Sequence, residues 1–258
     1  MNISPRIPRV ALVTGAARRI GAAIALALAG AGFDIAVHFR ASRDGAESLA
    51  PSIRRLGRRA ELFQRDLAKE SQIETLIEGV QAVLGPVGVL VNNASLFQRD
   101  EWDTVTRRSW DAHLDSNLRA PFVLTQHFAR SLPAEAEGLV INMLDQRVWS
   151  LTPHYISYSL SKYALWGLTQ SLALALAPRI RVNGIGPGPA LPNAQQSIAQ
   201  FEAQCASTPL RRGTSPQEIA VAVLAILRLP AMTGQMIALD GAQHLQWKSG
   251  RLQPREEE

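Results

Sequence analysis

Tyr158 and Lys162 lie four residues apart. On a helix this spacing places both side chains on one face, where a lysine cation lowers the pKa of a phenol from its ordinary value of about 10. The pair could therefore exchange protons near neutral pH, although a packed tyrosine beside a surface lysine has the same spacing. Tyr155 and Tyr163 are weaker candidates, because neither has a lysine four residues later. Asn117, in the preceding predicted helix, could hold a water molecule that relays protons.

A turn at residues 14–21 joins an apolar strand to an Ala-rich helix and contains two glycines. Glycine lets the backbone approach a ligand closely, and the free N–H groups and dipole at a helix N-terminus attract phosphate. The spacing is not G-x-G-x-x-G, so a plain strand-to-helix turn fits the same residues. The residues of this turn that we expect to contact a nucleotide are Gly15, Arg18, Arg19, Ile20 and Gly21.

The end of the second predicted strand distinguishes NAD from NADP, because an acidic residue there would bind the ribose 2′-hydroxyl. No acidic residue occurs from His38 to Arg43, and Arg40 can instead pair with a 2′-phosphate. The sequence therefore predicts NADPH as the cofactor. Further expected cofactor contacts follow the second, third and fourth strands: His38, Ser42, Asp66, Leu67, Asn93, Ala94 and Ser95.

Short apolar strands alternate with helical segments along the chain. This alternation predicts an α/β fold with a doubly wound parallel sheet and helices on both faces. Strands are expected at 10–14, 34–39, 60–64, 87–91, 138–143, 181–185 and 236–240. Helices are expected near 20–31, 44–56, 72–83, 107–131 (with a weak point at Pro121), 155–176 and 215–229. Ligands of such folds bind at the carboxyl edge of the sheet, where the candidate residues gather.

Composition narrows the class of protein. The 258 residues are 47% hydrophobic and 19% charged, which suits a packed core and argues against disorder. The formal charge of +5 and the pI near 10.0 could indicate a nucleic-acid partner, but the basic residues are scattered, so we expect none. A single cysteine, Cys205, permits no internal disulfide and fits a cytoplasmic protein. We expect no metal site, no signal peptide and no membrane span.

No composition break marks a linker, so residues 1–247 are expected to form one domain and 248–258 a flexible polar tail. One segment interrupts the rhythm of strands and helices. Residues 186–213 are rich in glycine, proline and polar residues, and a connection of this length is often functional. We interpret about 187–213 as a substrate lid at the carboxyl edge of the sheet.

Together these motifs resemble the short-chain dehydrogenase/reductase family. The turn at 14–21, the segment 92–94, Asn117, the Tyr158/Lys162 pair and Pro187-Gly188 occur in that family's order, and the resemblance covers about residues 9–242. It implies a single Rossmann-like domain with a seven-stranded parallel sheet, assembled as a homotetramer or homodimer. It also implies hydride transfer from a nicotinamide to a small-molecule substrate protonated by Tyr158, with Lys162, Pro187 and Gly188 beside the cofactor.

Two departures from the common family pattern point to a subgroup. Arg19 replaces the usual third glycine of the first turn, and Asp145 replaces the usual catalytic serine. With Ser95 and Phe97, these residues resemble the pteridine reductases and the bacterial dihydromonapterin or dihydrofolate reductases. The resemblance implies that Arg19 and Ser95 bind cofactor phosphate and pterin, and that Phe97 stacks on a pterin lying against the nicotinamide. Asp145 and Tyr158 would then protonate the substrate together.

The chemistry of a carboxyl group beside a phenol agrees with this subgroup. A ketone oxygen needs only a neutral donor, whereas a pterin is reduced at a C=N bond whose nitrogen needs a proton. An ionised Asp145 would raise the pKa of Tyr158 and oppose Lys162, so we expect the pair to share a proton and to titrate together. The sequence therefore predicts an NADPH-dependent pterin reductase. The alternatives are a reductase of another carbonyl or imine and, disfavoured by the intact proton-relay residues, a non-catalytic NADP(H) sensor.

Overall fold

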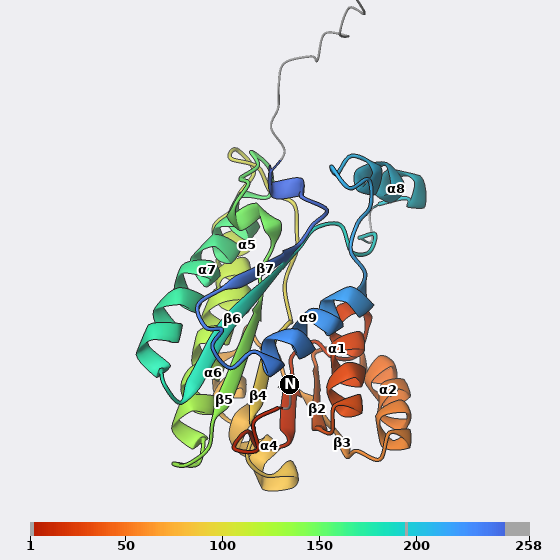
Figure 1. Ribbon diagram of the computed structural model, residues 1–258. Coiled ribbons are helices and arrows are strands. Elements are labelled where there is room, and N and C mark those ends of the chain that lie inside the picture. Colours follow the sequence, from red (N-terminus) through yellow and green to blue (C-terminus); the bar gives the residue numbers. More distant parts are fainter. Residues whose placement is uncertain (1–2, 194–195, 246–258) are drawn as a thin grey trace, which may run out of the picture.

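The computed structural model, which describes residues 3–193 and 196–245, contains one all-parallel sheet in the order β3-β2-β1-β4-β5-β6-β7 (Figure 1). The predicted α/β fold is therefore confirmed, and the expected tail at 248–258 lies outside the described residues. The strands are β1 (Val10–Val13), β2 (Asp34–Phe39), β3 (Ala60–Gln64), β4 (Val89–Asn92), β5 (Gly138–Met143), β6 (Ile180–Pro187) and β7 (Met236–Leu239).

Helices cover both faces of the sheet, as the alternation of strands and helices predicts (Figure 1). One layer consists of α1 (Arg19–Gly30), α2 (Arg43–Arg55) and α9 (Pro216–Arg228). The other contains α3 (Glu70–Glu74), α4 (Leu76–Leu84), α5 (Arg107–Leu114), α6 (Ala120–Ser131) and α7 (Ile156–Leu176). A further helix, α8 (Ile198–Ala206), stands beyond the carboxyl edge of the sheet.

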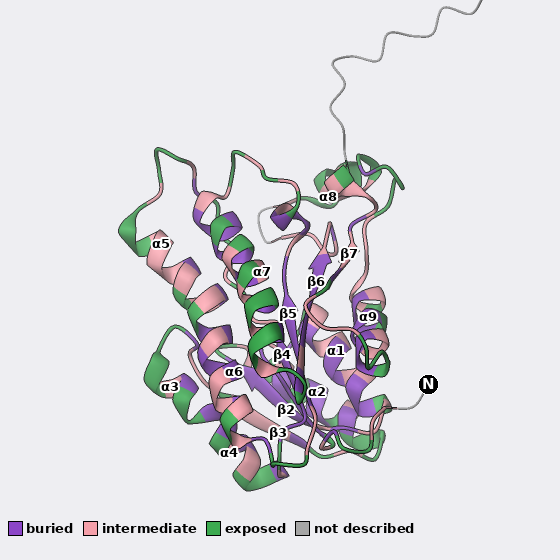
Figure 2. Cartoon of the chain, turned by 60° about the vertical axis from the view of Figure 1, so that its left-hand side comes forward, coloured by how far each residue is buried: buried purple, intermediate pink, exposed green. Residues whose placement is uncertain are grey.

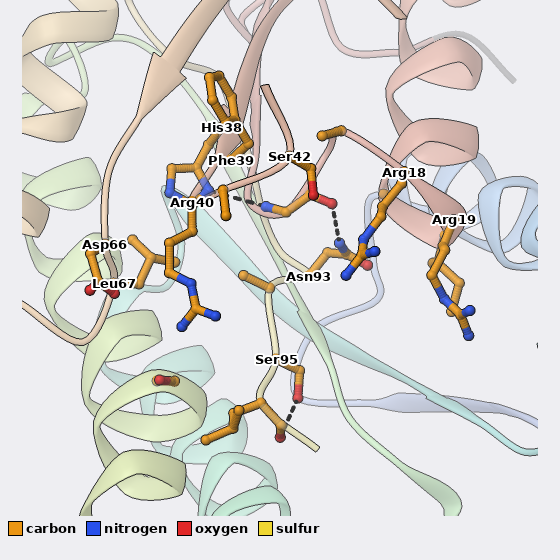
Figure 3. A pocket seen from close by; sticks show the side chains of 18 of the residues that line it. Arg18, Arg19, His38, Phe39, Arg40, Ser42, Asp66, Leu67, Asn93 and Ser95 are labelled. Carbon is orange, nitrogen blue, oxygen red and sulfur yellow. Dashed lines mark hydrogen bonds between the residues drawn. The ribbon is translucent and has the colours of Figure 1, made fainter. Parts of the chain in front are cut away.

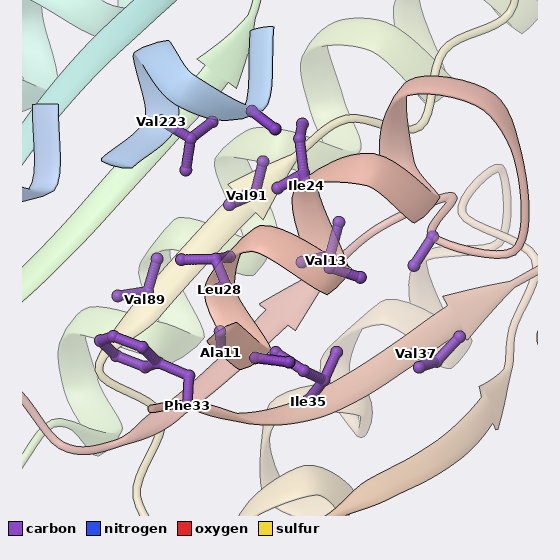
Figure 4. Close-up of a cluster of buried hydrophobic side chains, with 14 of the residues drawn as sticks. Ala11, Val13, Ile24, Leu28, Phe33, Ile35, Val37, Val89, Val91 and Val223 are labelled. Atoms are coloured by element: carbon purple, nitrogen blue, oxygen red, sulfur yellow. The ribbon is translucent and has the colours of Figure 1, made fainter. Parts of the chain in front are cut away.

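Strand β1 shows why helices must cover both faces of the sheet. Its four residues are all buried, and successive side chains of a strand point to opposite faces. Ala11 and Val13 pack with Ile24 and Leu28 of α1 (Figure 4), whereas Leu12 belongs to the core on the other face. Figure 2 shows the resulting buried sheet between two layers of half-exposed helices. Each large apolar side chain buried in this way stabilises the fold by about 1.5–3 kcal/mol.

Two predicted helices are divided in the structure. The segment expected at 72–83 forms α3 and α4, which meet at Thr75. The segment expected at 107–131 forms α5, a π-helical turn η1 (Asp115–Arg119) and α6. The weak point thus precedes Pro121, which lies in the first turn of α6, directly after the π-helical turn.

The segment interpreted as a lid contains a helix that we did not expect. Helix α8 begins with a capping box, in which Ser197 accepts from the Gln200 backbone and Gln200 reaches back to the Ser197 N–H. Elsewhere the predicted boundaries hold within three residues, and three strands match in full. Within the described part of the chain, no helix has the length and apolar character needed to cross a bilayer, and no acidic, His or Cys cluster could hold a metal ion.

Candidate active site

Two adjoining cavities lie at the carboxyl edge of the sheet. The first has a volume of about 390 Å³ and is bordered by the loops after β1, β2, β3 and β4. The second, of about 460 Å³, is bordered by the loops after β4, β5 and β6 and by α7 and α8. Four residues line both cavities, so the two spaces are continuous around Arg19, Ile20, Asn93 and Ser95.

The predicted residues divide between these cavities, with Asn117 as the one exception. The first cavity is lined by Gly15, Arg18, Gly21, His38, Arg40, Ser42, Asp66, Leu67 and Ala94 in addition to the four shared residues. The second is lined by Phe97, Asp145, Tyr158, Lys162, Pro187 and Gly188 in addition to the same four. The fold therefore brings the candidate residues together, while the ligand that each contacts stays a prediction.

The turn after β1 is shaped by close backbone packing. Gly15 has a positive φ of 63°, and a Cβ on Gly21 would lie 2.2 Å from the Gly15 carbonyl oxygen. Only glycine fits at Gly21 without moving the turn. The turn is further tied to the loop after β4, because Thr14 Oγ1 accepts from the backbone N–H groups of Asn93 and Ala94, each at 2.9 Å. Sequence reasoning did not single out Thr14, since its role depends on this contact between distant loops.

His38 is buried beside this turn, and its ring joins two loops (Figure 3). Its Nδ1 accepts from the Gly15 N–H at 3.1 Å, so its Nε2–H is the group that donates to the Arg65 carbonyl oxygen, also at 3.1 Å. Burial lowers the pKa of His38 from 6.5 to about 4. The imidazole is therefore neutral at physiological pH and acts as a fixed strut, with both ring nitrogens engaged by the protein.

The side chains of three arginines border the first cavity (Figure 3). Those of Arg18 and Arg40 have no hydrogen-bond or ion-pair partner within residues 3–193 and 196–245. Arg19 instead donates to two carbonyl oxygens of the segment after β6, at Pro192 (3.0 Å) and Leu191 (3.4 Å). Its backbone has a φ of 55°, the left-handed conformation for which glycine is the usual residue.

Asn117 sits in the π-helical turn η1 and is buried. Its Oδ1 accepts from the Leu96 N–H at 2.8 Å, and its Nδ2 donates to the Leu96 carbonyl oxygen at 2.9 Å and to Ser161 Oγ at 3.0 Å. The side chain thus holds the loop after β4 against α7. The water-relay role expected for Asn117 stays a prediction, since its amide lines neither cavity.

Asp145 and Tyr158 are in direct contact in the second cavity. The Tyr158 hydroxyl donates to Asp145 Oδ2 at 2.8 Å, and the same oxygen accepts from Nη1 of Arg147 at 3.0 Å. Burial and the Asp145 charge raise the pKa of Tyr158 well above its ordinary value, while Arg147 opposes that rise. Tyr158 is therefore a phenol at neutral pH, as a proton donor must be.

Lys162 is not a surface lysine beside a packed tyrosine, which was the other arrangement that its spacing from Tyr158 allowed. It is buried, and its Nζ donates to the Met143 carbonyl oxygen at 2.7 Å while lying 5.9 Å from the centre of the Tyr158 ring. Burial lowers the pKa of Lys162 to about 8, and Asp145 opposes that shift. The ammonium group thus supplies positive charge beside the phenol up to about pH 8.

An aromatic stack forms the outer wall of the second cavity. The Phe97 ring lies parallel to that of Tyr155, with centroids 4.7 Å apart, and meets Tyr158 edge-on at 4.6 Å. The backbone of Asp100 fixes this wall against the start of α7, because its carbonyl oxygen accepts from the Tyr155 N–H at 2.9 Å. The Asp100 carboxylate also caps the helix by accepting from the Ser157 N–H at 3.1 Å. Sequence reasoning placed Tyr155 only among the weaker catalytic candidates.

Comparison with known proteins supplies the family. A sequence profile described as short chain dehydrogenase matches residues 9–203. The chain is a short-chain dehydrogenase/reductase. It is 31% identical over 240 residues to the 3-oxoacyl-[acyl-carrier-protein] reductase FabG of Staphylococcus epidermidis, covering 91% of this chain and 98% of the relative.

Several solved structures share a larger fraction of this chain's sequence than the FabG relative does. The structure called FolM alternative dihydrofolate reductase 1 from Brucella canis, complexed with NADP, is 43% identical with a TM-score of 0.90, and the match covers 96% of this chain and 98% of that one. The corresponding protein of Brucella suis, also with NADP, is 45% identical, with a TM-score of 0.90 and coverage of 93% and 96%. A blue fluorescent protein from a metagenomic library, in complex with NADPH, is 33% identical with a TM-score of 0.85 and coverage of 93% and 99%.

Proposed function

We propose that this protein is an NADPH-dependent reductase of a pterin-type substrate, which it converts from the dihydro to the tetrahydro form. The contact between Asp145 Oδ2 and the Tyr158 hydroxyl is the observation that carries the proposal. A carboxyl group hydrogen-bonded to a buried phenol is suited to protonating a ring nitrogen. The similarity to the two FolM structures, both named alternative dihydrofolate reductase 1, supports the same substrate class.

The residues of the first cavity fit NADPH. The guanidinium groups of Arg18 and Arg40, with Ser42, would hold the 2′-phosphate, and the turn containing Gly15 and Gly21 would face the pyrophosphate. Asp66, Leu67, Asn93, Ala94, Pro187 and Gly188 would line the remainder of the cofactor. When bound, NADPH supplies the hydride.

The chain's own residues supply the protons and the positioning. Tyr158 donates its hydroxyl proton toward the substrate nitrogen, and Asp145, in contact with the same hydroxyl, helps to replace that proton. Lys162 stabilises the negative charge that develops on the phenol oxygen. Phe97 would stack on the pterin, while Arg19 and Ser95 would contact both substrate and cofactor. A charge-assisted donor of this kind accelerates proton transfer by about 10²–10⁴-fold.

A second candidate is the reduction of another carbonyl or imine, such as the 3-oxoacyl group named for the FabG relative. The observation in its favour is the 31% identity across nearly the whole chain. Asp145 argues against it, since a ketone oxygen needs no carboxyl partner. An NADP(H) sensor is disfavoured because such a protein needs no buried Tyr158/Lys162 pair. A cytoplasmic location and assembly as a homotetramer or homodimer are part of the proposal.

The proposal is tested by NADPH oxidation against a substrate panel. The panel holds dihydrobiopterin, dihydromonapterin, dihydrofolate, a 3-oxoacyl thioester and simple ketones, each with NADPH and with NADH. We expect turnover of at least one dihydropterin with NADPH, and a fall of about 10- to 100-fold in NADPH affinity for Arg40→Ala. Arg43→Ala, whose side chain pairs with Glu47 instead, is the matched control. Turnover of the thioester or ketones alone would favour the second candidate, and tight NADPH binding without turnover would favour the sensor.

A further inference from the structure

Arg147 holds both oxygens of the Asp145 carboxylate. The two residues lie at the start of a short 3-10 turn, η2 (Gln146–Val148), that follows β5. The backbone N–H of Arg147 donates to Asp145 Oδ1 at 2.9 Å, and its Nη1 donates to Oδ2 at 3.0 Å. Because Oδ2 also accepts from Tyr158, one arginine fixes the carboxylate at the point where it meets the phenol.

The guanidinium group of Arg147 lies among the three rings of the outer wall. Its central carbon is 5.3 Å from the ring centre of Tyr155, 5.7 Å from that of Phe97 and 6.0 Å from that of Tyr158. The side chain is only 20% exposed. Its buried Nε has no hydrogen-bond partner among the described residues, so ring faces rather than further acceptors surround it. Cation–π contacts of this kind are worth more where water is excluded.

We infer that Arg147 is a positioning residue for proton transfer, because it sets the orientation of the Asp145 carboxylate toward the Tyr158 hydroxyl and braces the Phe97–Tyr155 stack beside it. The inference rests on the proposed function for the identity of the substrate, but its geometry belongs to the protein alone. An arginine that merely stabilised the loop after β5 would need no contact with the rings. A planar guanidinium group can donate to Asp145 Oδ2 and lie against the rings at the same time, whereas a lysine could supply the charge and a donor but no planar group.

The experiment compares Arg147→Met, Arg147→Lys and wild-type enzyme in steady-state assays at pH 7. Arg147→Met should lower kcat by about 10- to 100-fold, while its Kd for NADPH changes by less than about twofold. Arg147→Lys should restore part of kcat, since it returns a charged donor for Asp145 Oδ2 without the planar guanidinium group that lies against the rings.

Arg99→Met is the matched control. Arg99 also lies over the Tyr155 ring, at 5.9 Å, but it pairs with Glu101 and does not reach Asp145. Its substitution should leave kcat and the Kd for NADPH unchanged. Equal kcat values for wild-type enzyme and Arg147→Met would overturn the inference.

Assays use the substrate that the wild-type enzyme reduces, so failure with pterins does not decide the role of Arg147. Should no substrate of the panel be reduced, crystal structures of the wild type and Arg147→Met give the answer. The Asp145–Tyr158 contact should persist in the wild type and be lost in the variant. An unchanged contact in the variant would refute the positioning role independently of the proposed function.

Discussion

The two cavities at the carboxyl edge of the sheet differ in which side chains are engaged with the protein itself. In the first cavity, neutral buried groups such as His38 and Thr14 hold the loops together, and the charged groups of Arg18 and Arg40 have no partner among the residues that the structure describes. In the second cavity, the charged and aromatic groups hold one another, as in the Asp145–Tyr158–Arg147 cluster. The first cavity therefore offers a ready anion site, whereas a ligand of the second must compete with existing contacts.

This difference matches the two tasks that we assign to the cavities. A cofactor with fixed phosphates is bound well by a preformed set of N–H groups and free cations. Proton transfer instead requires a donor kept protonated until the substrate arrives, and Tyr158 is kept so by burial and by Asp145. The comparison predicts that substitutions in the second cavity change the rate of reaction, and that substitutions in the first change stability and affinity.

The largest expected effect is the loss of the Tyr158 hydroxyl. Tyr158→Phe should lower kcat about a thousandfold, because it removes the proton donor, while affinity for NADPH stays within about twofold. Asp145→Asn should lower kcat by about a hundredfold, because the amide cannot replace the proton as a carboxyl group can. The measurements are steady-state rates with the accepted substrate and the quenching of protein fluorescence by NADPH.

Asp145→Ser tests whether the residue at position 145 determines the substrate class. It restores the residue usual in the family, so it should reduce simple ketones better than Asp145→Asn does while staying slow on the pterin. A near-wild-type rate for Tyr158→Phe or Asp145→Asn on the accepted substrate would contradict the assignment of proton transfer to the second cavity.

A smaller effect is expected at His38, and it should appear in stability rather than rate. The folded protein disfavours protonated His38, whose pKa is about 4 against 6.5 for a free side chain. The unfolded chain therefore binds the proton first, and the stability present above pH 6.5 is lost as pH falls toward 4. Between pH 7 and pH 5 this single group should lower the free energy of unfolding by about 2 kcal/mol.

His38→Gln provides the control, because a glutamine amide can accept from Gly15 and donate to Arg65 without titrating. Urea unfolding at pH 7 and pH 5 should show a loss about 2 kcal/mol larger in the wild type than in this variant. An equal loss in the two proteins would show that His38 takes up its proton in the folded state, contrary to its place as a neutral strut.

The sequence was sufficient to predict the sheet and the gathering of the candidate residues at its carboxyl edge. Segments such as 34–39, 60–64 and 138–143 were expected as strands, and the observed strands match them in full. Residues that follow strands must gather at one edge of a parallel sheet, which is why so many candidates line the two cavities. The role of each of these residues stays a prediction.

Features that depend on contacts between distant segments were not accessible. The π-helical turn at η1 has no local signal, because Asn117 meets Leu96 only in the folded chain. Arg147 lies two residues after Asp145 in the sequence, yet only the 3-10 turn brings its guanidinium group back to the carboxylate. Helix α8 is different, since the capping box of Ser197 and Gln200 was a visible local signal that sequence reasoning passed over.

The smallest expected effect lies at Arg19. This residue borders both cavities, and its guanidinium group is already bound to backbone carbonyl oxygens. Its left-handed backbone, with a φ of 55°, is strained for any residue with a side chain except asparagine and aspartate. Arg19→Gly should therefore be more stable than Arg19→Ala by about 1 kcal/mol in urea unfolding. Both variants lose the guanidinium group and should show the same weakened binding of NADPH. A difference in NADPH affinity between the two variants would mean that the backbone conformation at residue 19, rather than the charge of the Arg19 guanidinium group, determines how tightly NADPH binds.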